Sequence, residues 1–194
     1  MTYGAVILAA GEARRFGKPK QLLQWQGETL LERACRLAIT AGCHPVRVVL
    51  GARREAIARL ALPPEVTLVT NENWQEGMGN SLACGVRSLP EVDAVFVLLV
   101  DQPGVTVETL LRMKAPLESG EASLVQCQAG EWMGPPALFA RAHFSELAQL
   151  QGEEGGRAVI RKHLERRALV SAPEAKCDID SEAEWETFCD QQKS

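Results

Sequence analysis

The amino-acid sequence predicts an α/β protein, a three-layer α/β/α domain built around a mostly parallel sheet. Its 194 residues suffice for one such domain with a full core. Short β-branched apolar runs alternate with amphipathic helical patterns, an order that favours parallel strands joined by helices. The run 94–100 is apolar throughout, which is typical of a strand covered on both faces.

The first half of the chain shows this alternation most clearly. Strands are expected at 5–9, 46–51, 66–70 and 94–100, and helices at 28–41, 53–60, 79–87 and 106–115. A short hairpin that contains Trp25 is expected to close near Gln26 and Gly27. Because each strand is followed by a helix, the connections predict helices on both sides of one sheet.

The second half is less regular. Strands are expected at 122–126, 136–139 and 169–170, and helices at 142–150, 155–165 and 181–191. In the last helix Ser181 is the predicted N-cap and Glu184 takes the capping-box position.

Composition and charge narrow the classes of protein. The net charge of −4 and a pI near 5.5 argue against a nucleic-acid surface. The chain shows neither a basic leader nor an apolar run long enough for a membrane span, so a cytoplasmic protein without membrane contact is expected. The six cysteines form no CxxC pair and are expected as reduced thiols, with a zinc site or disulfides as the alternative. Three histidines (His44, His143 and His163) form no metal spacing, so surface or structural roles are expected.

A loop of small residues follows the first strand and contains Gly11, with Arg15 and Lys20 within the next nine positions. Backbone N–H groups exposed at such a loop bind anions, and two nearby cations suit a polyphosphate. The loop matches neither the P-loop pattern nor GxGxxG, which disfavours hydride chemistry on a dinucleotide. This combination points to an enzyme that uses a nucleotide.

Two further strands also end in polar residues. The third is followed by the polar, glycine-containing stretch 71–81, and the fourth ends at Asp101. An aspartate directly after a buried apolar strand is costly unless it faces a cation or hydrogen-bond donors. A magnesium ion that carries nucleotide phosphates would explain Asp101, and a capping or turn role is the alternative.

These residues resemble a known pattern. The segment 8–20 is similar to the LAAGxxxRFGxPK signature of the sugar-nucleotide and molybdenum-cofactor nucleotidyltransferases. Four later segments most resemble the molybdenum cofactor cytidylyltransferases, namely 71–81, 101–103, 152–163 and 178–181. Two segments depart from that pattern: Gly134-Pro135-Pro136 replaces Gly-His-Pro near the expected acceptor, and Ser181-Glu182-Ala183-Glu184 replaces Thr-Pro-Glu-Asp.

The resemblance implies a Rossmann-like nucleotidyltransferase fold, with nucleotide binding in residues 1–105 and acceptor binding in 106–194 of a single domain. It implies transfer of CMP from CTP to the terminal phosphate of molybdopterin, with release of pyrophosphate and with Mg²⁺, or Mn²⁺, as cofactor. Alternatives are GTP as donor to the same acceptor, CTP or UTP with a sugar or alcohol phosphate, and an accessory protein that only binds nucleotide. The product would pass to a molybdenum hydroxylase of the xanthine dehydrogenase type through a transient contact.

The resemblance also assigns residues. Arg15, Lys20 and Asp101 are the implied catalytic residues, and Asp101 and Asp180 the implied metal ligands, with Asp178 as a substitute for Asp180. The implied nucleotide-binding residues are Leu8, Ala9, Ala10, Gly11, Arg15, Lys20, Gly77, Met78, Asn80, Ser81 and Asp101. Ala10 favours cytosine over guanine because its methyl group leaves less room beside the base. For Asn80 and Ser81 helix capping is the alternative to base reading, and Met78 either packs on the ribose or fills the core.

Overall fold

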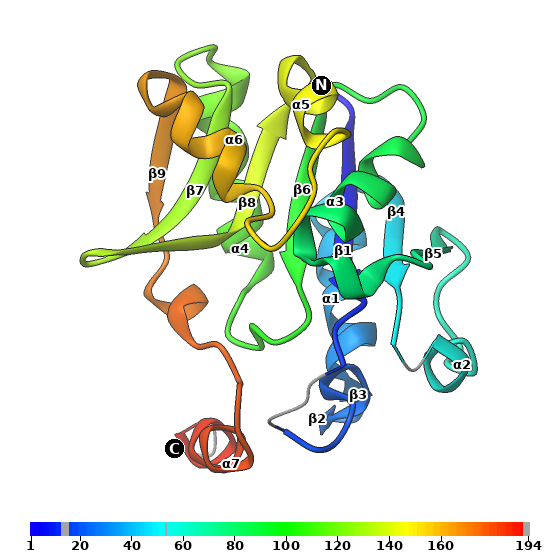
Figure 1. Cartoon of the computed structure of the whole chain (residues 1–194). Coiled ribbons are helices and arrows are strands. Elements are labelled where there is room, and N and C mark those ends of the chain that lie inside the picture. The colour runs from blue at the N-terminus through cyan, green and yellow to red at the C-terminus, as the bar shows by residue number, and fades with distance from the viewer. Residues whose placement is uncertain (13–15, 53, 192–194) are drawn as a thin grey trace.

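The computed structural model describes residues 1–12, 16–52 and 54–191, and its centre is one seven-stranded sheet (Figure 1). Its strands are β1 (Tyr3–Ala9), β4 (Cys43–Leu50), β5 (Val66–Thr70), β6 (Ala94–Leu99), β7 (Leu124–Ala129), β8 (Trp132–Ala140) and β9 (Arg167–Ser171). They lie in the order β5-β4-β1-β6-β8-β7-β9. Only β8 runs antiparallel to its neighbours β6 and β7, so the predicted mostly parallel sheet is confirmed.

Helices cover both faces of this sheet. The helices of the structure are α1 (Leu30–Thr40), α2 (Arg54–Ile57), α3 (Met78–Arg87), α4 (Val107–Glu118), α5 (Phe144–Leu147), α6 (Arg157–Lys162) and α7 (Glu182–Gln191), of which α7 lies beyond the end of the sheet. Single 3₁₀ turns add η1 (Lys20–Leu22), η2 (Trp74–Glu76), η3 (Arg141–His143), η4 (Leu164–Arg166) and η5 (Pro173–Lys176). No helix in the described part of the chain has the length and apolar character that a membrane span needs.

The two main cores follow from the alternation of side chains along each strand. In β1, Ala5 and Ile7 face the core beneath α1 and α4, whereas Val6 and Leu8 face the core beneath α3, α5 and α6. In Figure 1 α3 and α6 lie in front of the sheet and α1 behind it. Each fully buried branched side chain such as Ile7 stabilises this sandwich by about 1.5–3 kcal/mol.

A third, smaller core joins the two ends of the chain. Phe16, Ile179 and Phe188 are buried together, and the Trp25 ring meets Phe188 edge-on at 5.0 Å between ring centroids. Trp25 belongs to the predicted hairpin, which consists of β2 (Gln24–Trp25) and β3 (Glu28–Thr29). Figure 1 shows this hairpin and α7 at the same end of the molecule, beyond the carboxyl end of β1.

Some boundaries differ from the sequence-based expectation. The helix expected at 28–41 begins at Leu30, because Glu28 and Thr29 pair in the hairpin and Thr29 forms a capping box with Glu32. The helix expected at 53–60 is described only over Arg54–Ile57, with residue 53 outside the described part.

The largest differences lie in the second half. β8 begins four residues before the expected strand because its antiparallel pairing with β7 continues as far as Trp132. The helix expected at 142–150 is one 3₁₀ turn followed by the short α5, and the helix expected at 155–165 ends at Lys162, before η4. These segments are tied down by tertiary contacts, which local periodicity does not reveal.

Candidate active site

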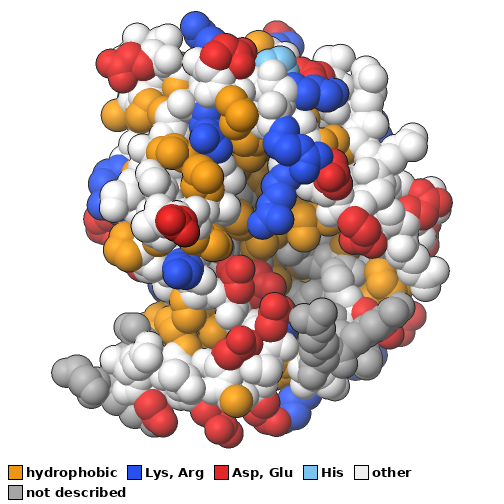
Figure 2. All heavy atoms as spheres, turned by 60° about the vertical axis from the view of Figure 1, so that its left-hand side comes forward, with side chains coloured by type: hydrophobic (Ala, Val, Ile, Leu, Met, Phe, Trp, Pro, Cys, Tyr) orange, Lys and Arg blue, Asp and Glu red, His pale blue; other side chains and the backbone are white. Residues whose placement is uncertain are grey.

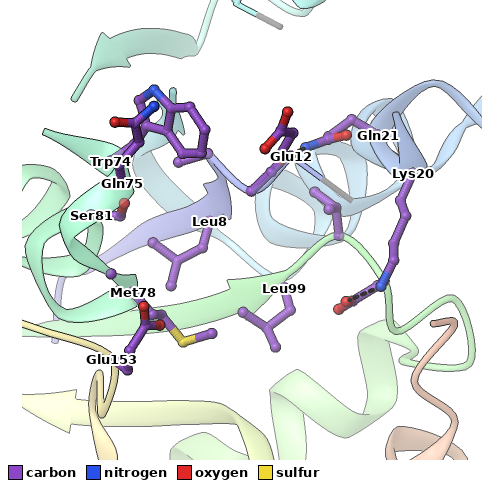
Figure 3. Close-up of a pocket in the computed structure, with 15 residues that line it drawn as sticks. Leu8, Glu12, Lys20, Gln21, Trp74, Gln75, Met78, Ser81, Leu99 and Glu153 are labelled. Carbon is purple, nitrogen blue, oxygen red and sulfur yellow. Dashed lines mark hydrogen bonds and ion pairs between the residues drawn. The ribbon is translucent and has the colours of Figure 1, made fainter. Parts of the chain in front are cut away.

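A pocket of about 410 Å³ opens at the carboxyl ends of β1 and β6, beside the first turn of α3. Leu8 and Leu99 lie in its centre, with Trp74 and Ser81 on one side and Lys20 on the other (Figure 3). Ligands of open α/β sheets bind at this edge. The pocket therefore lies where the polar strand ends predicted a nucleotide site.

Most of the sequence-predicted residues meet in this pocket. Its lining includes Leu8, Ala10, Gly11, Lys20, Gly77, Met78, Ser81 and Asp101. Ala9 is buried outside the lining, and Asp180 lines a neighbouring cavity. Arg15 lies outside the described residues, so its role stays a prediction.

Gln21 shapes the glycine loop and was missed by sequence reasoning. Its buried side-chain amide donates to the carbonyl oxygens of Ala9 and Gly11, at 2.8 and 3.2 Å. These bonds turn both carbonyls of the loop toward Gln21 and keep them away from the anion that the loop is predicted to bind. The available signal was its position directly after Lys20, the last residue of the motif.

Glycines fix the first turn of α3 against the loop that precedes α6. A Cβ at Gly77 would lie 2.4 Å from the backbone of Gly152, and Gly77 has a φ of 119°, so both space and conformation require glycine. The N–H of Gly79 donates to the carbonyl of Gly152 at 2.7 Å. This close contact places Met78, which is 44 % exposed, over the mouth of the pocket and excludes the core role for it.

Asn80 is not among the residues that line this pocket, so its expected place beside the base stays a prediction. Its side-chain oxygen accepts from the N–H of Gly152 at 2.9 Å, and its amide donates to Glu76. These two hydrogen bonds let Asn80 position the loop at Gly152. Ser81 does line the pocket, and its hydroxyl accepts from the amide of Asn71 at 3.0 Å.

The charged centre of the site consists of Lys20, Asp101 and Asp180. The Lys20 ammonium lies 3.1 Å from an oxygen of Asp101 and 2.6 Å from an oxygen of Asp180, although 160 residues separate Lys20 from Asp180. Burial by itself lowers the pKa of Lys20, but the hydrogen bond to Asp180 and the charge of Asp101 raise it above its ordinary value. Lys20 is therefore a permanent cation.

The third core holds these groups together. Ile179 is buried in that core, and its N–H donates to the carbonyl of Asp101 at 2.9 Å. The chain on either side of Ile179 thus brings Asp178 and Asp180 to the end of β6. Burial, followed by the negative charge of Asp101, raises the pKa of Asp178 to about 6.

This donor set fits a hard divalent cation. Oxygens of Asp101 and Asp180 already converge on one ammonium group, and Asp178 adds a third carboxylate, whose pKa is raised first by burial and then by the negative charge of Asp101. Mg²⁺ and Mn²⁺ prefer oxygen ligands, and Mg²⁺ typically takes one or two carboxylates together with substrate phosphates. The arrangement therefore supports the two metal ligands implied by the sequence.

A second cavity of about 510 Å³ adjoins the first, and both are lined by Leu8, Met78, Leu99, Asp101 and Glu153. Its walls include Asp178 and Asp180, apolar side chains such as Phe139, and two arginines of α6, Arg157 and Arg161. In Figure 2 an apolar hollow lies between basic side chains above and acidic side chains below. Arg161 pairs with Glu154, whereas Arg157 has no ion pair within the described ranges.

Two of the three histidines lie side by side, although their positions in the sequence show no metal-ligand spacing. His143 and His163 are 20 residues apart in sequence, yet their ring centroids lie 4.6 Å from one another, with Glu146 beside them. Neither histidine lines the two cavities. The fold, not a local motif, brings them together.

The fold and the site have the features of one class of protein: a Rossmann-like, mostly parallel sheet with a pocket at its carboxyl edge and a lysine and carboxylates beside that pocket. The chain belongs to the family described as the MobA-like NTP transferase domain, whose model matches residues 5–168. It is thus a nucleotidyltransferase of that family.

Two curated relatives align along most of their length. The nicotine blue oxidoreductase of Paenarthrobacter nicotinovorans is 32 % identical over 167 residues, which are 81 % of this chain and 80 % of the relative. The purine catabolism protein PucB of Bacillus subtilis is 27 % identical over 193 residues, or 93 % of each chain.

Solved structures show the same fold. Rv0371c of Mycobacterium tuberculosis superposes with a TM-score of 0.81 at 28 % identity, covering 98 % of both chains. A further structure of Rv0371c was determined in complex with manganese and superposes with a TM-score of 0.75 over 98 % of this chain and 99 % of that chain.

Proposed function

We propose that this protein transfers CMP from CTP to the terminal phosphate of molybdopterin and releases pyrophosphate. The observation that carries the proposal is the position of Lys20, Asp101 and Asp180 at the junction of two adjoining cavities. A nucleotidyl transfer requires such an arrangement, because a donor and an acceptor must meet at one charged centre. The family match and the motif resemblance supply the substrate class.

The donor triphosphate would enter the first pocket over the glycine loop. Backbone N–H groups at Ala10 and Gly11 would bind phosphate oxygens, and Gln21 keeps the neighbouring carbonyls turned away from them. Lys20 would leave the carboxylates and bind the α-phosphate as negative charge develops there. The nucleotide would lie between Trp74 and Met78, beside the Ala10 methyl group that disfavours guanine.

Asp101 and Asp180 would hold Mg²⁺, or Mn²⁺, which supplies Lewis-acid stabilisation of the phosphates. The acceptor phosphate is already an anionic nucleophile, so the chain needs no general base. What it must supply is positioning of two anions and compensation of their charge. Lys20 would compensate the charge. The hydrogen bond from the N–H of Ile179 to the carbonyl of Asp101 would help to position the two anions, because it holds the chain that carries Asp180 beside Asp101.

The acceptor would occupy the second cavity. Apolar walls such as Phe139 suit the body of a ring system, and Arg157 suits its anionic groups. The names of the two relatives, an oxidoreductase and a purine catabolism protein, agree with a product destined for a molybdenum hydroxylase. We propose a transient contact with such an enzyme.

The test is pyrophosphate release from purified protein with molybdopterin and Mg²⁺, using CTP, GTP, ATP and UTP separately. Release with CTP alone is the expected result. Release with GTP alone would retain the mechanism and overturn the base assignment, and release that requires a sugar or alcohol phosphate would overturn the acceptor.

The Lys20→Ala variant tests the mechanism within that assay. Loss of a cation that acts in the transition state should lower kcat/KM by about 10²–10³-fold, or about 3–4 kcal/mol. Lys18→Ala is the matched control, because Lys18 is 67 % exposed and pairs with Glu182 instead of the aspartates. A folded Lys20→Ala protein with turnover within about tenfold of the wild-type value would contradict the assigned role.

A further inference from the structure

A second group of chemically active side chains lies outside both cavities. It consists of His143 at the end of η3, Glu146 in α5 and His163 directly after α6. One ring nitrogen from each histidine and one carboxylate oxygen of Glu146 all lie within 4.8 Å of one another. Two imidazoles and a carboxylate form a familiar ligand set for zinc.

The buried histidine supplies an independent observation. His143 is only 4 % exposed, and its Nε2 lies 2.8 Å from the hydroxyl of Ser123. Its Nδ1 is buried and has no hydrogen-bond partner within the described residues. A buried polar atom without a partner costs about 1–3 kcal/mol, so a ligand for Nδ1 would be favourable.

The hydrogen bond between His143 Nε2 and the Ser123 hydroxyl is of the kind that metal-binding histidines usually make. Histidines that bind metals usually make a hydrogen bond with their second nitrogen, which fixes the ring and the tautomer. When Nε2–H donates to the Ser123 hydroxyl, the lone pair of Nδ1 is left available. Burial, followed by the charge of His163, lowers the pKa of His143, which agrees with a neutral ring.

The other two groups are accessible to an incoming ion. The side chains of His163 and Glu146 are 29 % and 32 % exposed, and His163 Nε2 lies 2.6 Å from Glu146 Oε1. Lys162 lies on the other carboxylate oxygen, at 3.4 Å. Bound zinc would replace the hydrogen at His163 Nε2, and this proton would move to Nδ1 of the same ring or be released to water.

We infer that His143, Glu146 and His163 bind one Zn²⁺ ion, with water in the fourth position. Zinc bonds of about 2.0–2.1 Å place tetrahedral ligand atoms about 3.3 Å apart. The ligand atoms now lie within 4.8 Å of one another. Rotation of the partly exposed side chains of Glu146 and His163 toward His143 would bring them to the shorter separation that zinc requires. The site excludes Mg²⁺, which prefers oxygen ligands and retains its water.

The ion would join the end of α6, which borders the second cavity, to η3 and α5, which do not line it. His163 ends α6, whose Arg157 and Arg161 line that cavity, and His143 and Glu146 lie on the neighbouring η3 and α5. Because neither histidine lines either cavity, zinc at this position would lie outside the transfer site. It would hold the arginine-bearing wall against the sheet and would not take part in the transfer.

The test uses the full chain after treatment with a chelator and titration with Zn²⁺ alone, followed by calorimetry. We expect one Zn²⁺ per chain, retained in the presence of excess Mg²⁺. His163→Gln and Glu146→Gln should each weaken binding at least about tenfold, since each removes one of three ligands. His44→Gln, which changes an exposed histidine elsewhere, should bind as the wild type does.

Two further measurements distinguish zinc at the histidine cluster from metal bound at the aspartates or at cysteine thiolates. Asp101→Asn should leave zinc binding unchanged, because the predicted Mg²⁺ ligands lie elsewhere. Co²⁺ should give the visible spectrum of a tetrahedral site with nitrogen and oxygen ligands, without a thiolate charge-transfer band. Absence of stoichiometric binding, equal affinity in His163→Gln, or a thiolate band would each overturn the inference.

Discussion

At the scale of single residues, each polar side chain of the candidate site contacts a small, specific group of partners. Lys20 contacts two carboxylates, Gln21 holds two carbonyls, and Asn80 is engaged by the loop at Gly152. Because these partners are specific, substitutions at the site should alter one kinetic parameter at a time. Two predictions belong to this scale.

The first concerns the choice of base. Ala10 lines the nucleotide pocket and is packed against it, with 6 % of its surface exposed. Ala10→Gly would open space beside the base, so kcat/KM for GTP should rise relative to that for CTP by about tenfold, the effect of one methyl group. Pyrophosphate release with both nucleotides measures this ratio.

Ala9→Gly is the control for the Ala10 variant. Ala9, the last residue of β1, is buried directly before Ala10 and does not line the pocket, so loss of its methyl group should destabilise the protein without changing the nucleotide ratio. An unchanged ratio in Ala10→Gly would refute the steric argument.

The second concerns the acceptor. Arg157 lines the second cavity without an ion pair in the described part of the chain. Its bond to an anionic acceptor group should contribute about 1.5–3 kcal/mol, so Arg157→Ala should raise the KM for the acceptor about 10- to 100-fold. The KM for CTP should stay the same. Arg166→Ala, which changes an exposed arginine of η4 outside the cavity, should alter neither value.

At the scale of elements, the third core assembles the charged centre. α7 packs through Phe188 onto the hairpin that follows Lys20, and the chain before α7 contributes Asp180. Sequence periodicity located the hairpin and α7 separately. It did not indicate that they touch, because their contact joins segments more than 150 residues apart.

Phe188→Ala tests this assembly. Phe188 is 4 % exposed, and truncation of a buried phenylalanine costs about 3–5 kcal/mol. Since the affected core is small and local, we expect faster hydrogen exchange in residues 16–29 and 179–191, together with a loss of transfer activity. The main sheet should keep its protection. Leu111→Ala, at a 49 % exposed position of α4, is the matched control and should leave exchange in these segments unchanged.

At the scale of the whole molecule, the cluster of carboxylates links stability to pH. The pKa of Asp178 rises from 3.8 in the unfolded chain to about 6 in the folded protein. Between pH 3.8 and about pH 6 the folded protein therefore binds more protons than the unfolded chain does. The stabilising contribution of Asp178 to the free energy of unfolding is fully present below about pH 3.8, and it is lost as the pH rises through about 6.

Asp178→Asn should therefore stabilise the metal-free protein at neutral pH. Because the Asp178 side chain also meets solvent, we expect only about 1 kcal/mol at about pH 7.5 and almost no difference at about pH 4. Urea unfolding at both pH values measures this, with the exposed Glu121→Gln as control. A gain of equal size at both pH values would exclude titration as the cause.

The sequence by itself determined the class of fold and the first half of the site. The apolar runs of β1 and β6 and the glycine loop are local patterns, and local patterns report how one segment lies in a sheet. The strand ends at Gly11 and Asp101 meet in the pocket because parallel strands bring their carboxyl ends to one edge.

Only the tertiary structure decided how distant segments meet. The antiparallel course of β8, the use of Asn80 as a positioning residue and the meeting of His143 with His163 all depend on contacts between segments that share no local pattern. Asp180 was implied by resemblance, but its 2.6 Å contact with Lys20 exists because burial of Phe16, Ile179 and Phe188 draws the two chain ends together. Hydrophobic burial acts without regard to sequence separation, so spacing along the chain could not reveal these encounters.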